Sequence, residues 1–225
     1  MKVILFGATG MIGQGTLLDA LDDPRVEHVL GVVRRGTAKQ HAKYSELIHA
    51  DFTDFTAVEA QLTGYEACLY CLGISAAGLD EPAYRKITYD YTLAAARTLL
   101  KVNPKITFCF ISGQGTDATG KSRQMWARVK GEAENAVAKL GFARAYMFRP
   151  GFIKPVRGVV SATRSYRILY AIIGPIYPLL RAAFPRSLMT SAQLGQALLN
   201  AASDGAPKTV LEAADILDLV KVAVK

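Results

Sequence analysis

The sequence predicts an α/β fold with a doubly wound, mainly parallel sheet. Short apolar runs alternate with longer helical patterns from the first residue onward, and the first run leads directly into a glycine-rich loop that opens a helix. Strands that are apolar throughout are typical of a parallel sheet covered on both faces, and parallel neighbours need a crossover between them. The alternation therefore predicts a sheet with helices on both sides.

The expected elements follow one another along the chain. Apolar runs rich in Val, Ile, Phe and Cys predict strands at 2–7, 28–33, 46–51, 67–73, 106–112 and 144–150. Helical patterns predict helices at 11–21, 54–62, 81–102 and 122–140. The stretch "RRGTAKQHAK" (34–43) after the second strand carries only a weak helical pattern, so a loop is the alternative there.

The pattern changes in the last third of the chain. Residues 151–189 contain several prolines and a long apolar run, a Thr/Gln capping box at 190–193 opens a helix, and "TVLEAADI" (209–216) predicts a last short strand. We therefore expect a core at 1–150 and a C-terminal lid or substrate region at 151–225 that completes the same domain.

The positive charge is concentrated in one segment. The net charge is +8, and between Arg149 and Arg186 there are seven basic residues and no acidic one. This distribution argues against a nucleic-acid partner, which would need a basic face spread over a domain. Residues 160–186 have three interpretations: a lid over an apolar or acidic substrate, a packing or dimer contact, and docking on an anionic membrane surface. A homo-oligomer is compatible with the second of these.

Cysteine use predicts a reducing, cytoplasmic location. Cys68, Cys71 and Cys109 are an odd and sparse set, unsuited to a disulfide framework. Cys68 and Cys71 lie three apart in an expected strand, so they face opposite sides and are expected to be core residues rather than a redox pair. The start of the sequence has no secretory signal pattern, and no apolar stretch reaches the roughly 18 to 20 residues of a membrane span.

The glycine-rich loop predicts a dinucleotide site. Gly7, Gly10 and Gly13 lie between the first strand and the first helix with G-x-x-G-x-x-G spacing. Glycines let the backbone approach a pyrophosphate, which then lies on the free N–H groups of the helix N-terminus. The first 150 residues are therefore expected to form a dinucleotide-binding core.

The end of the second strand favours NADP(H) over NAD(H). An acidic residue there would bind the ribose hydroxyls of NAD, whereas Arg34 and Arg35 suit a 2′-phosphate; the alternative is two solvated arginines. Asp51 and Phe52 end the third strand, where they could contact the adenine, and Asp51 could equally cap the next helix. The expected cofactor contacts are Gly7, Thr9, Gly10, Met11, Ile12, Arg34, Arg35, Asp51, Phe52, Cys71, Leu72, Gly73, Lys130 and Pro150.

With "GATGMIGQG", "RRG", "SGQGT", "VKGEAENAV" and "FRPGFI" in view, the chain resembles the short-chain dehydrogenase/reductase superfamily. It is most similar to the atypical, epimerase-like NAD(P)-binding members, including the Tat-interacting oxidoreductase-like proteins. The resemblance implies a Rossmann-type fold and a catalytic set of Ser, Tyr and Lys. Ser112 falls on the serine position and Lys130 on the lysine position, where it would bind the ribose.

The tyrosine position is held by Trp126. In the family the phenol exchanges a proton with the substrate oxygen, but an indole N–H is only a donor and does not ionise usefully near neutral pH. Trp126 can stack on a flat ring without doing this acid–base work. Tyr84, Tyr166 and Tyr170 could reach the site instead.

Two functions follow as expectations. The first is an NADP(H)-preferring oxidoreductase or epimerase-like enzyme that acts on a small carbonyl or hydroxyl compound, with Ser112 orienting the substrate oxygen. The second is a non-catalytic NADP(H)-binding redox sensor or regulatory protein that has lost the tyrosine. No metal site is expected, because the three histidines lack ligand spacing.

Overall fold

The computed structural model describes residues 1–159 and 186–222. It confirms the predicted α/β class: seven parallel strands form one sheet in the order β3-β2-β1-β4-β5-β6-β9. These strands are β1 (Lys2–Phe6), β2 (His28–Val33), β3 (Tyr44–Ile48), β4 (Ala67–Tyr70), β5 (Thr107–Ile111), β6 (Arg144–Arg149) and β9 (Val210–Glu212). A second small parallel sheet pairs β7 (Phe152–Lys154) with β8 (Leu188–Thr190).

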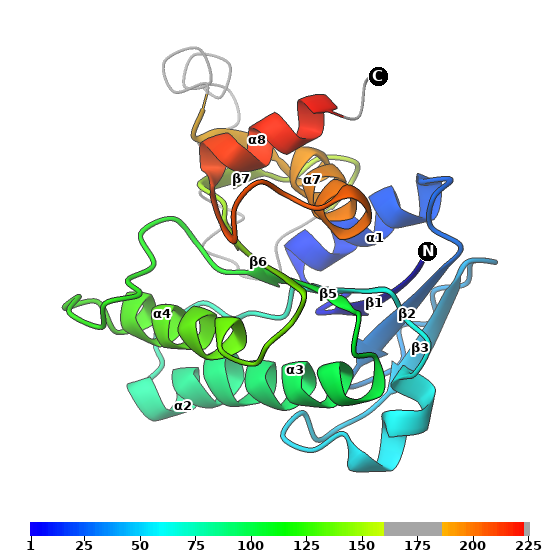
Figure 1. Cartoon of the computed structure of the whole chain (residues 1–225), viewed down its shortest axis with the longest axis horizontal. Coiled ribbons are helices and arrows are strands. Elements are labelled where there is room, and N and C mark those ends of the chain that lie inside the picture. The colour runs from blue at the N-terminus through cyan, green and yellow to red at the C-terminus, as the bar shows by residue number, and fades with distance from the viewer. Residues whose placement is uncertain (160–185, 223–225) are drawn as a thin grey trace.

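Helices cover both faces of the large sheet (Figure 1). One layer consists of α1 (Met11–Asp22), α7 (Ser191–Asp204) and α8 (Ala213–Val222). The other contains η1 (Thr56–Leu62), the continuous helix of α2 (Glu81–Arg85), η2 (Lys86–Asp90) and α3 (Tyr91–Val102), and α4 (Met125–Ala138). The central strands are therefore buried from end to end, and all five residues of β5 are inaccessible.

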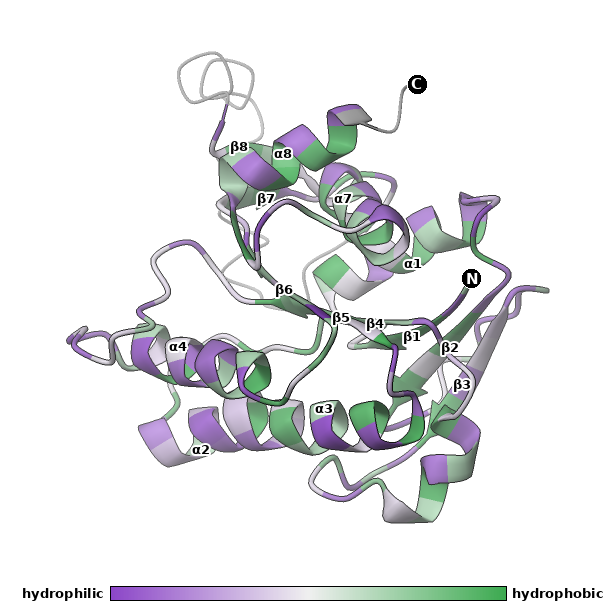
Figure 2. Ribbon diagram, viewed as in Figure 1, coloured by the Kyte–Doolittle hydropathy of each residue, from purple (hydrophilic) through white to green (hydrophobic). Residues whose placement is uncertain are grey.

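Each sheet face has its own apolar core. Val3 and Leu5 of β1 face the α1 and α7 layer, whereas Ile4 and Phe6 face the α3 and α4 layer. Cys68 and Cys71 also lie on opposite faces, and all three cysteines are buried free thiols. The prediction that these two cysteines are core residues is confirmed. Figure 2 shows the apolar residues gathered in the strands and on the helix faces that meet them.

Several predicted boundaries are corrected by the structure. The third strand is Tyr44–Ile48 rather than 46–51, and 34–43 contains no helix. The fourth helix begins at Met125 rather than 122. Of "TVLEAADI", only Val210–Glu212 is strand, and α8 follows at once.

The C-terminal third is built onto the N-terminal helix. Thr190 and Gln193 form the predicted capping box, with Gln193 N donating to Thr190 Oγ1 at 3.1 Å and Thr190 N donating to Gln193 Oε1 at 2.9 Å. Helix α7 packs on α1 through two glycines. A Cβ atom at Gly195 would lie 2.2 Å from Asp19 Oδ2, and one at Gly15 would lie 3.0 Å from the Cβ of Ser191.

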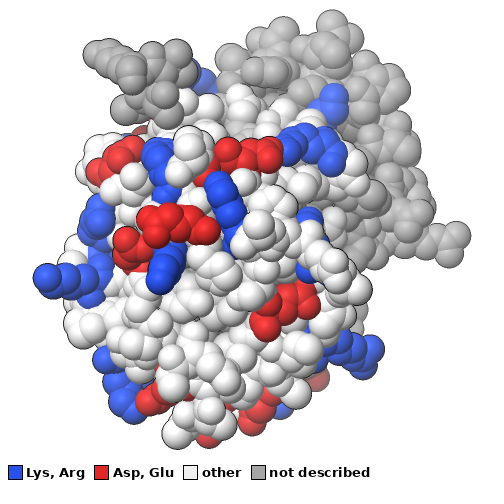
Figure 3. Space-filling view, turned by 90° about the vertical axis from the view of Figure 1, so that its right-hand side faces the viewer, with Lys and Arg blue, Asp and Glu red and all other residues white. Residues whose placement is uncertain are grey.

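The predicted lid falls largely on residues 160–185, which lie outside the described residues. On the face drawn in Figure 3, acidic and basic side chains are interspersed. Within 1–159 and 186–222, no helix combines the length and the apolar character needed to cross a bilayer.

Candidate functional site

The glycine loop brings two predicted cofactor segments into contact. Gly7 has a φ of +78°, which favours glycine. A Cβ atom there would lie 2.7 Å from the carbonyl carbon of Cys71 and from the nitrogen of Leu72. The end of β1 therefore touches the end of β4, and Gly73 follows with open space beside it.

Helix α1 begins with free amides. Gly10 is its N-cap, no side chain of the described residues caps the helix, and its first turn holds no acidic residue. The nitrogen of Gly10 donates to the oxygen of Gly7 at 2.9 Å, and Gln14 Nε2 donates to the oxygen of Thr9 at 2.7 Å, so the loop is held in shape. Uncapped N–H groups at the end of a helix fit a pyrophosphate. Met11 and Ile12 are the first two helical residues, and their side chains pack against the core.

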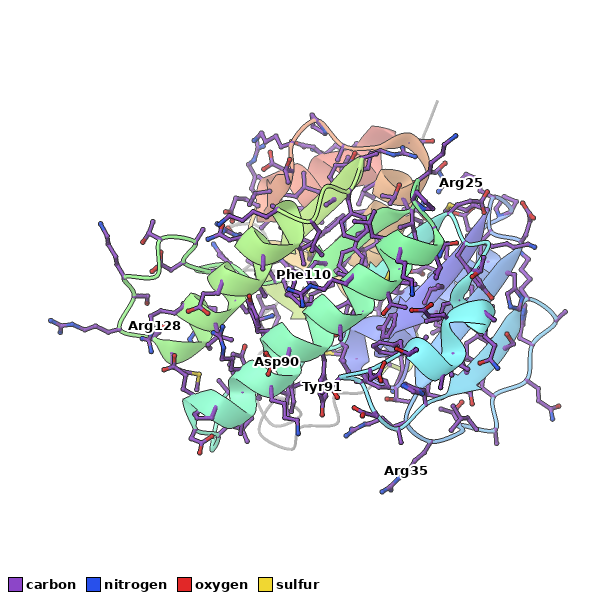
Figure 4. All side chains as sticks on the ribbon, turned by 60° about the horizontal axis from the view of Figure 1, so that its bottom comes forward. Arg25, Arg35, Asp90, Tyr91, Phe110 and Arg128 are labelled. Atoms are coloured by element: carbon purple, nitrogen blue, oxygen red, sulfur yellow. The ribbon has the colours of Figure 1, made fainter. Side chains whose placement is uncertain are left out.

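Arg34 and Arg35 line a hollow beside this loop. Its walls are Thr9, Arg34, Arg35, Gly36, Thr37 and Ala50. Both arginines are exposed, and among residues 1–159 and 186–222 no carboxylate forms an ion pair with either. In Figure 4 the side chain of Arg35 extends away from the body of the protein. Two unpaired cations beside an uncapped helix fit an additional phosphate.

A carboxylate on β3, which the sequence reading missed, fixes the loop after these arginines. Glu46 accepts from the nitrogen of Thr37 at 2.8 Å, from the Thr37 hydroxyl, and from the Tyr44 hydroxyl at 2.9 Å. Burial raises the pKa of Glu46, but the hydrogen bonds from Thr37 and Tyr44 lower it by more. The pKa therefore lies below its ordinary value. Nothing local in the sequence links Glu46 to Thr37.

The structure decides one of the two roles that the sequence left open for Asp51. Asp51 is exposed, and its Oδ1 accepts from Thr53 N at 2.9 Å; Thr56, the first residue of η1, is held by Asp54 instead, so Asp51 does not cap that helix. The ring of Phe52 is only 3% exposed and lies 6.0 Å from the ring of Phe6. The ring of Phe52 therefore belongs to the apolar core, and the predicted contact of Asp51 and Phe52 with the adenine stays a prediction.

Ser112 follows β5 directly, and its side chain is buried. Its Oγ lies 2.9 Å from Oγ1 of Thr116, which donates to the oxygen of Gly113 at 2.7 Å. Because the Thr116 hydrogen is used on Gly113, Ser112 is the donor within the pair. In this arrangement Ser112 offers lone pairs to a substrate.

Lys130 reaches back from α4 to the end of β5. Its Nζ donates to the oxygens of Ile111 and Ser112, at 3.3 Å each, and lies 5.7 Å from the centre of the Phe110 ring. Burial lowers the pKa of Lys130 to about 8, and the carboxylate of Glu134 opposes this shift. The structure thus brings Lys130 and Ser112 together. Figure 4 shows Phe110 beneath the helices of this face.

Trp126 is the second residue of α4 and is half-buried. A Cβ at Gly115 would lie 3.4 Å from its Cη2 atom, so the indole packs against the loop that leads from Ser112. That loop also touches α4 at Gly131, where a Cβ would lie 1.9 Å from the oxygen of Asp117. No local pattern in the sequence indicates this second contact.

A buried ion pair behind Lys130 was also missed by sequence reasoning. Arg149 Nε donates to Glu134 Oε1 at 2.9 Å, Arg149 Nη2 donates to Glu134 Oε2 at 2.5 Å, and Arg149 Nη1 donates to Glu212 at 3.1 Å. The spacing of Glu134, one helical turn after Lys130, indicates that these two side chains share a helix face, but it does not indicate Arg149 as a partner.

The remaining predicted residues lie near these groups or outside the described part. Pro150 is buried, and its oxygen accepts from Gln114 N at 3.0 Å. Tyr84 is buried, and Tyr166 and Tyr170 lie outside the described residues. Within 1–159 and 186–222, no group of His, Cys, Asp and Glu residues is placed to hold a metal ion.

Comparisons with known proteins agree with this geometry. A family model described as "NAD dependent epimerase/dehydratase family" matches residues 3–128. The chain is 28% identical over 208 residues to "Protein fmp52, mitochondrial" of Emericella nidulans, which covers 89% of this chain and 86% of that protein. It is 27% identical over 155 residues to "Protein HTATIP2" of Rattus norvegicus, which covers 68% of this chain and 62% of that protein.

Among solved structures, the Bordetella bronchiseptica enzyme WbmH in complex with NAD+ matches with a TM-score of 0.67 at 17% identity, covering 94% of this chain and 74% of that one. At this identity the likeness concerns the fold, which is Rossmann-like. The resemblance inferred from the glycine loop is confirmed, because the family model spans more than half of the chain. The protein is a member of the NAD dependent epimerase/dehydratase family, a family of NAD(P)-binding proteins.

Proposed function

We propose that this protein is an NADP(H)-preferring oxidoreductase that acts on a small carbonyl or hydroxyl compound. The observation that carries the cofactor preference is the hollow beside the glycine loop, where Arg34 and Arg35 stand without carboxylate partners among the described residues. The family's description names NAD, and WbmH was solved with NAD+, so NADP(H) preference would be this chain's own departure.

In the proposed complex, the dinucleotide supplies or accepts hydride and the chain's residues position it. Gly7, Gly10 and the first amides of α1 hold the pyrophosphate, and Lys130 binds the ribose. Ser112 donates its own hydrogen to Thr116, so its oxygen can accept a hydrogen bond from a substrate hydroxyl. Trp126 provides a flat surface, and water or another group transfers the proton.

The cofactor part is tested by fluorescence titration with NADPH and NADH. The Arg34→Ala/Arg35→Ala variant should lose about tenfold or more in NADPH affinity, because charged hydrogen bonds to the 2′-phosphate are removed, and should change little for NADH. Arg97→Ala, which removes an exposed arginine on α3, is the matched control. Equal affinities for both cofactors in the unmodified protein would contradict the preference.

A non-catalytic NADP(H)-binding regulatory protein is the second candidate, and Trp126 at the tyrosine position favours it. Single-turnover assays over a panel of small carbonyl and hydroxyl compounds separate the two. Oxidation of bound NADPH, or reduction of bound NADP+, by any compound supports the enzyme. Tight NADPH binding with no turnover across the panel supports the regulatory protein.

A further inference from the structure

Four charges of alternating sign lead from the candidate site to the edge of the sheet. They are Lys130 and Glu134 on α4, Arg149 at the end of β6, and Glu212 on β9. Glu134 and Arg149 meet through two hydrogen bonds at 2.9 and 2.5 Å, and Arg149 reaches Glu212 at 3.1 Å. The side chains of Glu134, Arg149 and Glu212 are 3%, 14% and 50% exposed, so the series begins deep and ends at the surface.

Lys130 has no direct ion-pair partner among the described residues, and its ammonium donates to two backbone oxygens. Glu134 follows it by four residues, so the two lie on one face of the helix. Both oxygens of Glu134 accept from Arg149, which holds the carboxylate in place. Its charge acts on the ammonium through a partly buried region, where screening is weak.

Three of the charged groups on the other helices around α4 form ion pairs with residues other than Lys130. Helix α4 packs against α2, η2, α3 and β6. Glu81 and Arg85 of α2 pair with Arg128 and Glu132, and Lys101 of α3 pairs with Glu59. The remaining titratable or charged groups on these elements and on the adjoining loop are Tyr84, Lys86, Tyr89, Asp90, Tyr91, Arg97, Asp117, Lys121, Arg123, Arg144 and Tyr146.

We propose that Glu134 is the positioning residue that keeps Lys130 an ammonium at neutral pH, and that Arg149 holds Glu134 in place for this task. The last strands of the sheet thereby help to set the charge of the group that is to bind the cofactor. The inference rests on the proposed function only for the statement that this ammonium binds the dinucleotide.

The test measures the titration of Lys130 in the full chain without cofactor. Acetylation with a trace of acetic anhydride over a range of pH, read by mass spectrometry of the peptide that carries Lys130, gives its apparent pKa, with exposed Lys139 as the internal reference. The variants are Glu134→Gln and Glu134→Gln/Arg149→Met. The second removes both buried charges together, so that no unpaired arginine is left if the first variant fails to fold.

Glu132→Gln is the matched control. It removes a carboxylate from the same helix two residues from Lys130, and residues two apart do not face each other. The apparent pKa of Lys130 should fall by about one unit in Glu134→Gln and stay unchanged in Glu132→Gln. In Glu134→Gln/Arg149→Met it should fall by less, because a positive charge is removed together with the carboxylate. An unchanged value in the folded Glu134 variants would overturn the inference and leave an ion pair that serves only packing.

NADPH titration of the same proteins separates this inference from the proposed function. If the ammonium binds the cofactor, a drop of one unit lowers NADPH affinity about fivefold at pH 8 and has almost no effect at pH 6.5, because the protonated fraction sets the apparent affinity. A shifted Lys130 pKa without this pH-dependent loss would support the role of Glu134 and contradict the role of Lys130 in binding.

Discussion

Helices α1 and α4 both carry a glycine against which a loop oxygen lies, yet they serve the candidate site in different ways. A Cβ at Gly13 would lie 2.0 Å from the oxygen of Gly7, and one at Gly131 would lie 1.9 Å from the oxygen of Asp117. The loop before α1 leaves the helix amides free. The loop before α4 is instead satisfied internally, with Asp117 accepting from Thr119 and Ser122.

The comparison separates a backbone site from a side-chain site. The α1 contact shapes a turn whose N–H groups are available to a ligand, and almost any side chains around it will do. The α4 contact fixes the path between Ser112 and Trp126, so that Lys130 meets the end of β5. The first presents backbone amides, and the second holds particular side chains in place.

The largest effect is expected from a substitution that disrupts the glycine loop before α1. Gly13→Ala should lower the free energy of unfolding by about 2–3 kcal/mol, because the added methyl group must displace the Gly7 carbonyl. NADPH affinity should fall about 100-fold as the loop shifts away from the pyrophosphate. Urea unfolding and fluorescence titration measure the two effects.

Gly10→Ala is the stability control for this variant. Its Cβ would lie 3.4 Å from the same oxygen, and its φ of −79° suits alanine, so it should unfold near the wild type. Equal stability of both alanine variants would contradict the role given to the Gly13 contact.

Gly131→Ala should break the side-chain site instead. A loss of about 2–3 kcal/mol in unfolding free energy is expected here too, since Asp117 must move. NADPH affinity should fall less than in Gly13→Ala, within about tenfold, because the glycine loop is intact. If both variants lost the cofactor equally, the two parts of the site would not be separable.

The next effect is a pH dependence of the free energy of unfolding, and it comes from Asp19 on α1. Burial raises the pKa of Asp19 to about 6, against the opposing effect of Arg157. The folded state therefore binds this proton more tightly than the unfolded state, and the stability it contributes is lost as pH rises through about 6. Between pH 4.5 and 7 the loss should amount to about 2 kcal/mol from this group.

Urea unfolding at the two pH values checks the Asp19 effect. Asp19→Asn should lack that part of the pH dependence, and Asp22→Asn, which alters the exposed partner of Arg157, should keep it. Identical pH slopes in the wild type and Asp19→Asn would show that Asp19 titrates normally.

The smallest structural effect is expected from Trp126→Tyr. This variant places a phenol at the tyrosine position of the family while the backbone of α4 stays unchanged. Stability should change by less than about 1 kcal/mol and NADPH affinity by less than about twofold, because the indole packs at the edge of the loop. Single-turnover reduction of carbonyl compounds should rise. Trp126→Phe, which has no hydroxyl, should show no gain; a gain in both variants would assign the effect to size.

The sequence predicted the α1 side of the site far better than the α4 side. Gly7, Gly10 and Gly13 are close in the chain, so their spacing alone describes the turn. The contact of Gly131 with Asp117 joins a helix to the preceding loop, and no sequence spacing predicts such a contact. The pair of Glu134 with Arg149 joins a helix to a strand, which spacing does not predict either. The burial of the Phe52 ring could not be predicted either, because an aromatic residue at a strand end serves equally well in the core.

The close contact of α1 with α7 has a consequence for the order in which the chain is made. Gly15 and Gly195 allow these helices to meet, but residues 191–204 leave the ribosome long after 11–22. The face of α1 that α7 covers in the folded protein therefore stays exposed until α7 has been synthesised, and exposed apolar surfaces of this kind are prone to aggregate. The helix after the glycine loop is therefore synthesised well before the helix that covers it.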